Sequence, residues 1–227
     1  MTTENETLSW RFCLLVALAL GAALGLADAL AGLARLAGLP RSPLAAGAGF
    51  FLMAMALAVY KKKRVVPCVA AGGVLAKWLA VPLLGLPLLC QANAHLAMLL
   101  NGAFLFAGVA MARRRITGNP GVQAAVAGGA AFGAGAAFFA LGRFWAPCAH
   151  LLSFRYAGGA GHYLFTRVAP AALAAALLFP LGYALGRRLE RWLLPRWLAR
   201  KPLFAPLAAA WSLGCWALIA WITAAGR

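Results

Sequence analysis

Acidic residues are almost absent from this chain. Of its 227 residues only four are Asp or Glu, against 21 Lys or Arg, and the formal net charge is +17. Charged residues make up 11% of the sequence and hydrophobic residues 64%, whereas a soluble domain has about a quarter charged and about half apolar residues. Because so few charges cannot form a water-exposed surface, the composition predicts an integral membrane protein without a sizeable water-soluble domain.

Motifs of soluble enzymes and metal-binding modules are also missing. The five cysteines include no Cys-x-x-Cys, which excludes a zinc ribbon and a thioredoxin-type site. The sequence has no P-loop, Gly-x-Ser-x-Gly, His-Glu-x-x-His or paired-carboxylate arrangement. The chain is therefore not itself an ATPase, and its motifs do not favour an enzyme. The first residues lack a basic n-region, so we expect the apolar stretch after them to be a retained helix.

Long apolar runs dominate what remains. About 20 apolar residues cross a bilayer core of about 30 Å as a helix, and seven stretches approach this length. They are Phe12–Leu33, Leu44–Tyr60, Val65–Leu89, Ala92–Ala112, Val122–Leu141, Val168–Gly186 and Leu203–Ala224. We predict an all-α, polytopic bundle of six or seven transmembrane helices, forming one membrane domain over residues 1–227 with a short polar segment, 1–10. Pro67, Pro82 and Pro87 predict that the third helix is kinked or broken near its end.

Basic residues are concentrated in three clusters, Lys61–Arg64, Arg113–Arg115 and residues 187–201, which follow the second, fourth and sixth stretches. Cytoplasmic loops of membrane proteins retain Lys and Arg. One orientation in a bacterial-type inner membrane places all three clusters inside, with the N-terminus in the cytoplasm. This topology signal explains most of the basic surplus through the lipid bilayer, with no nucleic acid as partner. Similar runs at Val69–Gly73 and Val126–Gly129 hint at helical-hairpin repeats, although hairpins that obey the charge rule look alike in any case.

Two charged residues fall inside the predicted helices. A charge near the bilayer centre is costly and marks a functional site by default. Asp28 shares a helical face with Gly21 and Gly25, and small residues mark the packed side of a membrane helix, so we expect Asp28 to point into protein. Lys77 falls near mid-depth. Asp28 can pair with Lys77 or with Arg35, either as a fixed structural lock or as part of a binding site.

The segment 143–167 is the longest predicted outer connection. It carries Arg143, Arg155 and His162, together with aromatic residues that suit a membrane interface, and it has no acid. Three glycines near its middle give it a flexible backbone. We expect either a cover over a cavity or an interfacial loop.

All three histidines and two of the cysteines fall on or near the outer face in this topology. They are Cys90, His95, Cys148, His150 and His162. Cys90, Cys148 and His150 are candidate metal ligands, and the alternatives are haem ligation by two histidines, a Cys90–Cys148 disulfide, or a purely structural role. The spacing does not select among them, so any cofactor stays unknown. The surrounding positive charge disfavours a divalent cation.

The leading functional hypothesis is a transport protein, either a permease or a substrate-capture subunit, that binds a small anionic or zwitterionic solute from the outer side. The residues expected to bind the solute are Asp28, Lys77, Asn93, His95, Asn101, Arg143, Arg155 and His162. Energy would come from an ion gradient or from partner subunits such as an energising ATPase module. One alternative is a membrane-embedded enzyme or haem or metal redox subunit that uses the outer cysteines and histidines. Another is an accessory membrane anchor.

In size and architecture the chain looks like the substrate-binding subunits of energy-coupling-factor vitamin transporters, although it has no motif specific to that family. The likeness implies a small helical bundle that binds its ligand from outside. It also implies that small-x-x-x-small runs, such as Ala19–Ala23 and Gly21–Gly25, are the place for a partner to dock.

Overall fold

The computed structural model describes residues 10–34, 38, 40–84, 88–145, 149–192 and 201–225, and all its regular elements in these ranges are helices. The seven long helices are α1 (Trp10–Ala34), α2 (Arg41–Tyr60), α3 (Val65–Leu84), α4 (Leu88–Ala112), α5 (Pro120–Trp145), α8 (Ala169–Trp192) and α10 (Lys201–Ala225). The short elements are a 3-10 turn, η2 (Arg113–Thr117), helices α6 (Ala149–Leu152) and α7 (Gly159–Tyr163), and a π-helical turn, η3 (Leu164–Val168). The predicted all-α bundle is confirmed.

Some observed helix ends differ from the predicted ones, at places where a proline or a polar residue lies near the end of the apolar run. Helix α2 begins at Arg41 and not at Leu44, because Pro43 is tolerated in a first turn, whose N–H groups have no partner within the helix. Helix α3 ends at Leu84 and not at Leu89. Pro67 and Pro82 lie within α3, and Pro87 lies outside the described residues, so the kink or break stays a prediction.

The predicted outer connection 143–167 is shorter than expected. Helix α5 continues to Trp145, and α7 passes through the π turn η3 into α8 without interruption, so both ends of the predicted loop are helical. Gly158 has φ of +84°, a left-handed conformation that glycine adopts without strain, and it directly precedes α7. Much of the predicted basic surface segment falls at 193–200, which lies outside the described residues.

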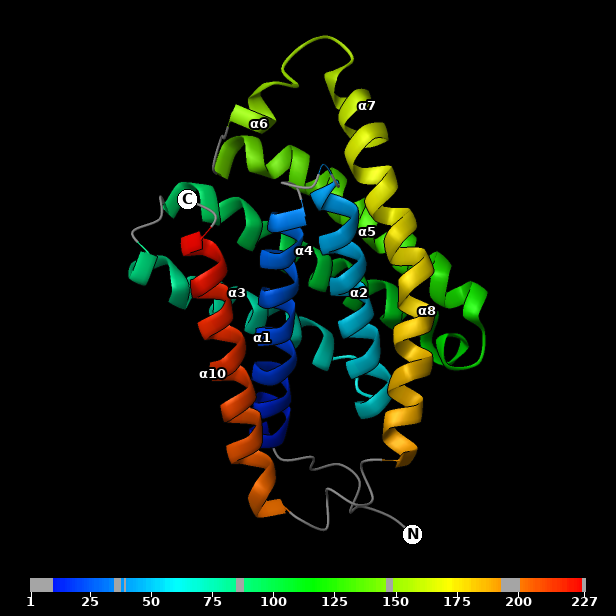
Figure 1. Ribbon diagram of the computed structural model, residues 1–227. Helices are drawn as coiled ribbons and strands as arrows, with labels where there is room; N and C mark the ends of the chain where they lie inside the picture. Colours follow the sequence, from blue (N-terminus) through cyan, green and yellow to red (C-terminus); the bar gives the residue numbers. More distant parts are fainter. Residues whose placement is uncertain are drawn as a thin grey trace.

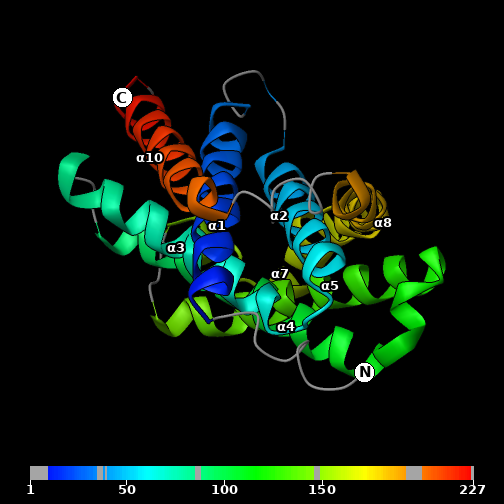
Figure 2. The ribbon, with the colours of Figure 1, turned by 90° about the horizontal axis from the view of Figure 1, so that it is seen from below.

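The long helices form two layers. Helices α10, α1, α2 and α8 run side by side in that order, and α3, α4 and α5 cross behind them (Figures 1 and 2). The most extensive contact joins α2 to α8, followed by those of α1 with α3 and α4 with α5. Since α8 packs on α2 and α5 while α10 packs on α1 and α3, α8 and α10 are not a packed hairpin. The internal repeat stays a prediction.

Glycines bring the backbones of α2 and α8 into direct contact. A Cβ atom on Gly182 would lie 2.3 Å from the carbonyl oxygen of Phe51, and one on Gly186 would lie 2.6 Å from that of Met55. Gly182 and Gly186 are four residues apart and therefore occupy one helix face. This is the small-residue packing that membrane helices use.

The Gly21–Gly25 run is used in the same way inside the bundle. A Cβ on Gly21 would lie 2.5 Å from the carbonyl carbon of Gly72 on α3, and one on Gly25 would lie 3.2 Å from the Cδ1 atom of Ile219 on α10. The run predicted as a docking surface for a partner is thus already covered by α3 and α10.

Large apolar side chains cover the outside of the bundle. On α8, Leu173, Leu177 and Leu181 form a stripe in which the residues are 61%, 62% and 58% exposed. A soluble monomer rarely exposes apolar surface of this extent. Four described segments are also long and apolar enough to cross a membrane: Arg41–Tyr60, Ala92–Ala112, Pro120–Trp145 and Gly159–Arg191. These features identify the protein as a membrane protein.

The ends of α2 and α8 meet at one end of the bundle, here called the basic end, which carries Lys61–Arg64 and the described arginines Arg187, Arg188 and Arg191. Lys61 forms an ion pair with Glu190, which joins the turn after α2 to the end of α8. The Nζ atom of Lys63 lies 5.5 Å from the ring centroid of Phe106 on α4. Ile116 of the turn after α4 belongs to the same buried core as Val65.

Candidate functional site

A cavity of about 720 Å³ lies at the end of α2 and α8 opposite the basic end. Helices α1, α2, α4 and α5 and the continuous α7–η3–α8 helix line it. Its polar lining residues are Asp28, Arg41, Ser42, Asn93, Asn101, Tyr163 and Arg167. Pockets for small ligands typically measure roughly 300 to 1,000 Å³, so the cavity has room for a metabolite-sized solute.

Asp28 is the only acid among the lining residues of this cavity, and two cations share it. Its Oδ2 atom accepts a hydrogen bond from Arg41 Nη2 at 3.0 Å and a second from Lys77 Nζ. Asp28 is 9% exposed and Lys77 8%, so this carboxylate and this ammonium are both withdrawn from solvent. The predicted burial of Asp28 and its pairing with Lys77 are confirmed. Arg35, the alternative partner, lies outside the described residues.

The cations that line the cavity are Arg41 and Arg167. Arg41 opens α2, and its side chain is 45% exposed. Arg167 extends from the π turn, and none of the ion pairs between described residues involves it. The first turn of α2 also begins here, and Pro40 provides no side-chain cap, so its N–H groups add partial positive charge. The lining therefore has an excess of positive charge.

Two amide side chains from α4 complete the polar lining. Asn93 is buried and Asn101 half-buried, and Ala97 lies between them on the same side of the helix. An amide can donate and accept hydrogen bonds. Asn93 and Asn101 can therefore bind the neutral polar groups of a solute.

Aromatic packing closes the cavity on the side of the α5–α8 connection. The ring centroids of Phe139 and Tyr163 are 4.7 Å apart, and those of Tyr163 and Phe154 are 5.3 Å apart. With Leu151 and Val168 these rings form a separate apolar cluster. Since Leu151, Tyr163 and Val168 also line the cavity, this connection forms part of the cavity wall.

Three of the eight predicted solute-binding residues, Asp28, Asn93 and Asn101, line the cavity, and the other five do not. Lys77 does not line the cavity, but it forms an ion pair with Asp28, which does. His95 is buried on α4, and its Nε2 atom has no hydrogen-bond partner in the described part of the chain. Arg143 lies over the ring of Phe139, with Cζ 4.8 Å from the centroid. Arg155 and His162 are exposed.

The predicted outer cluster of cysteines and histidines is only partly described. The side chains of Cys90, Cys148 and His150 lie outside the described residues. Of the remaining two members, His95 is buried on α4 and His162 is exposed on α7. Within the described ranges, no group of three His, Cys, Asp or Glu side chains could hold a metal ion.

Arg41 and Tyr163 were not predicted as site residues, and Arg167 was predicted only as the end of a loop. The signal for Arg41 is its position between Pro40 and Pro43, which is typical of a helix start. For Arg167 the signal is the apolar helical pattern that continues without a break from Tyr163 into α8.

Comparison with protein-family models, with curated proteins and with solved structures finds no match for this chain. Its class therefore rests on its own architecture, an α-helical membrane bundle with a polar cavity at one end.

Proposed function

We propose that this protein is an inner-membrane transport protein, a permease or a substrate-capture subunit, that binds a small anionic or zwitterionic solute in the cavity. The cavity's excess of positive charge is the observation that carries the proposal. Arg41 and Arg167 face one acid, Asp28, which Lys77 already pairs. An anion would bring this group of charges closer to neutrality.

A carboxylate or phosphate can bind here by exchanging ion-pair partners. Arg41 is half in solvent, so it can turn from Asp28 to the incoming anion while Lys77 continues to neutralise Asp28. Arg167 and the first turn of α2 supply further attraction. An ammonium group on a zwitterionic solute would find Asp28 within the same cavity. Asn93 and Asn101 would bind its uncharged part.

The charge distribution supports an orientation with the N-terminus in the cytoplasm. Lys61 pairs with Glu190, so the first basic cluster lies beside the described arginines at the end of α8, and such clusters stay on the cytoplasmic side. The cavity then opens toward the outside. Since the sequence has no nucleotide-binding motif, an ion gradient or a partner ATPase module would supply the energy. A reporter fused after Lys62 tests the orientation, and periplasmic activity of that fusion would overturn it.

A measurement of ligand binding distinguishes a solute-binding cavity from one with a purely structural role. We would measure the unfolding temperature of purified protein with succinate, glycerol phosphate, glutamate, neutral glycerol and cationic putrescine. A bound solute raises the unfolding temperature with its concentration, and we expect this from at least one of the anionic or zwitterionic solutes.

The matched variants are Arg167→Gln, which changes the cavity, and Arg155→Gln, which changes an exposed arginine outside it. We expect Arg167→Gln to weaken binding by about tenfold or more, the value of a hydrogen bond to a charged group, and Arg155→Gln to bind as wild type. Stabilisation by putrescine or glycerol alone, or equal losses in both variants, would contradict the proposal.

A further inference from the structure

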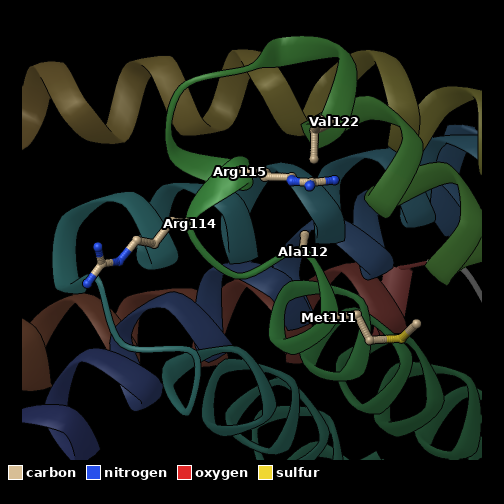
Figure 3. Close-up of a pocket in the computed structure, with 5 residues that line it drawn as sticks. All are labelled: Met111, Ala112, Arg114, Arg115 and Val122. Carbon is tan, nitrogen blue, oxygen red and sulfur yellow. The ribbon is translucent and has the colours of Figure 1, made fainter.

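A second cavity, of about 800 Å³, lies beside the basic turn between α4 and α5. Its lining residues are Met111, Ala112, Arg114, Arg115 and Val122 (Figure 3). The side chain of Arg115 extends toward Val122, while Arg114 leaves the turn in another direction (Figure 3). A cationic group and apolar side chains therefore meet in one open hollow.

The turn that carries the two arginines is held firmly. Ile116 is buried in the main core, and its carbonyl oxygen accepts a 2.7 Å hydrogen bond from Nε2 of the buried Gln123. The hydroxyl of Thr117 donates a 2.7 Å hydrogen bond to the carbonyl oxygen of Arg114. The backbone of Arg114 and Arg115 thus keeps a fixed position, unlike that of a mobile surface loop.

Neither guanidinium group has an acidic partner. The ion pairs within the described ranges include neither Arg114 nor Arg115. The start of α5 is already capped, because Asn119 Oδ1 accepts hydrogen bonds from the N–H groups of Gly121 at 2.8 Å and Val122 at 3.2 Å. An anion at this place would therefore bind the arginine side chains and not the helix terminus.

The apolar part of the hollow distinguishes a lipid from a soluble anion. Met111 is 83% exposed at the last turn of α4, and it lines the hollow together with Ala112 and Val122. Inorganic phosphate would leave these side chains uncovered. In a membrane bundle, a basic turn directly after a spanning helix lies at the depth of the lipid headgroups.

We propose that this hollow binds one anionic phospholipid. The phosphate group lies on the guanidinium of Arg115, with Arg114 adding attraction, and an acyl chain covers Met111 and Val122. Basic pockets between membrane helices bind acidic headgroups by this combination of charge and apolar contact. None of its lining residues lines the solute cavity, so the site does not depend on the proposed transport function.

Lipid binding to the full-length protein tests the proposal. Purified protein in neutral detergent is titrated with phosphatidylglycerol or phosphatidylcholine, and bound lipid is counted by native mass spectrometry. We expect phosphatidylglycerol to bind more tightly. Arg115→Gln should weaken its binding by about fivefold, the effect of one basic residue at a membrane surface. Arg188→Gln, at an exposed arginine of another basic cluster, should leave binding unchanged.

Because Arg115 is exposed, its replacement should leave the unfolding temperature of lipid-free protein unchanged, which separates lost binding from misfolding. Equal binding of the two lipids would overturn the proposal, as would equal losses in the two variants. Displacement of phosphatidylglycerol by inorganic phosphate alone would overturn the lipid assignment, since the apolar contacts would then contribute nothing.

Discussion

Removing only the Asp28 charge of the buried Asp28–Lys77 ion pair should destabilise the protein more than removing both charges. Asp28→Asn leaves the Lys77 ammonium, 8% exposed, without its carboxylate. Lys77→Met leaves Asp28 with Arg41 as its sole partner in the described structure. The double variant removes both charges and keeps side chains of similar length.

Burial sets the expected magnitudes. Removing one member of a buried ion pair costs about 3 to 5 kcal/mol because the other charge stays uncompensated. We expect Asp28→Asn to reach this range and Lys77→Met to fall at its lower end, because Arg41 still neutralises Asp28. Arg41→Gln should cost at most about 1 kcal/mol, since the Arg41 side chain is 45% exposed and solvent screens its charge.

Thermal unfolding of the single and double variants in detergent measures the coupling between the two residues. We expect the double variant to be more stable than Asp28→Asn alone, which requires a coupling larger than the roughly 3 kcal/mol that Lys77→Met costs by itself. Losses that simply add would show that the two side chains do not stabilise each other. Lys77 would then not be the residue that neutralises the buried Asp28 carboxylate in the cavity wall.

Three further changes test the packing, the membrane surface and the α4–α5 turn. Gly182→Ala should destabilise the bundle by about 1 to 3 kcal/mol because its Cβ would force α8 from α2, whereas Gly214→Ala, with open space around it, should be neutral or stabilising in the same thermal unfolding assay. Leu177→Lys should reduce membrane integration, at a cost of about 3 kcal/mol for a lysine facing lipid; the unchanged yield typical of a soluble surface would refute the lipid-facing assignment. Gln123→Leu should lower the unfolding temperature by removing the hydrogen bond to Ile116, at a cost of about 1 to 3 kcal/mol.

The helices were predictable because lipid imposes a strong compositional constraint on each one. Apolar runs located all seven long helices, and errors were confined to their ends, as at Arg41 and Leu84. The pairing of Asp28 with Lys77 was also predictable, since each is costly to place alone and both fall on faces rich in small residues.

The other cavity residues depend on information that the sequence pattern lacks. Arg41 meets Asp28 because the start of α2 packs beside α1, and helical periodicity does not encode which helices pack together. Arg167 looked like a loop residue, because a glycine-rich stretch concealed that α7 runs into α8. Arg155 and His162 carry equally suitable chemistry, but the chain places them on the surface.

The π turn at Leu164–Val168 lets this segment carry one residue more than a regular helix. A π turn accommodates one extra residue, and each residue of an α-helix rotates the chain by roughly 100°. Because the π turn absorbs that rotation, Tyr163 stays against Phe139 while the leucines of α8 keep their place. Deleting the exposed Phe165 would therefore turn the π turn into regular helix and keep both the aromatic wall of the cavity and the bundle, so this position tolerates a difference of one residue in chain length.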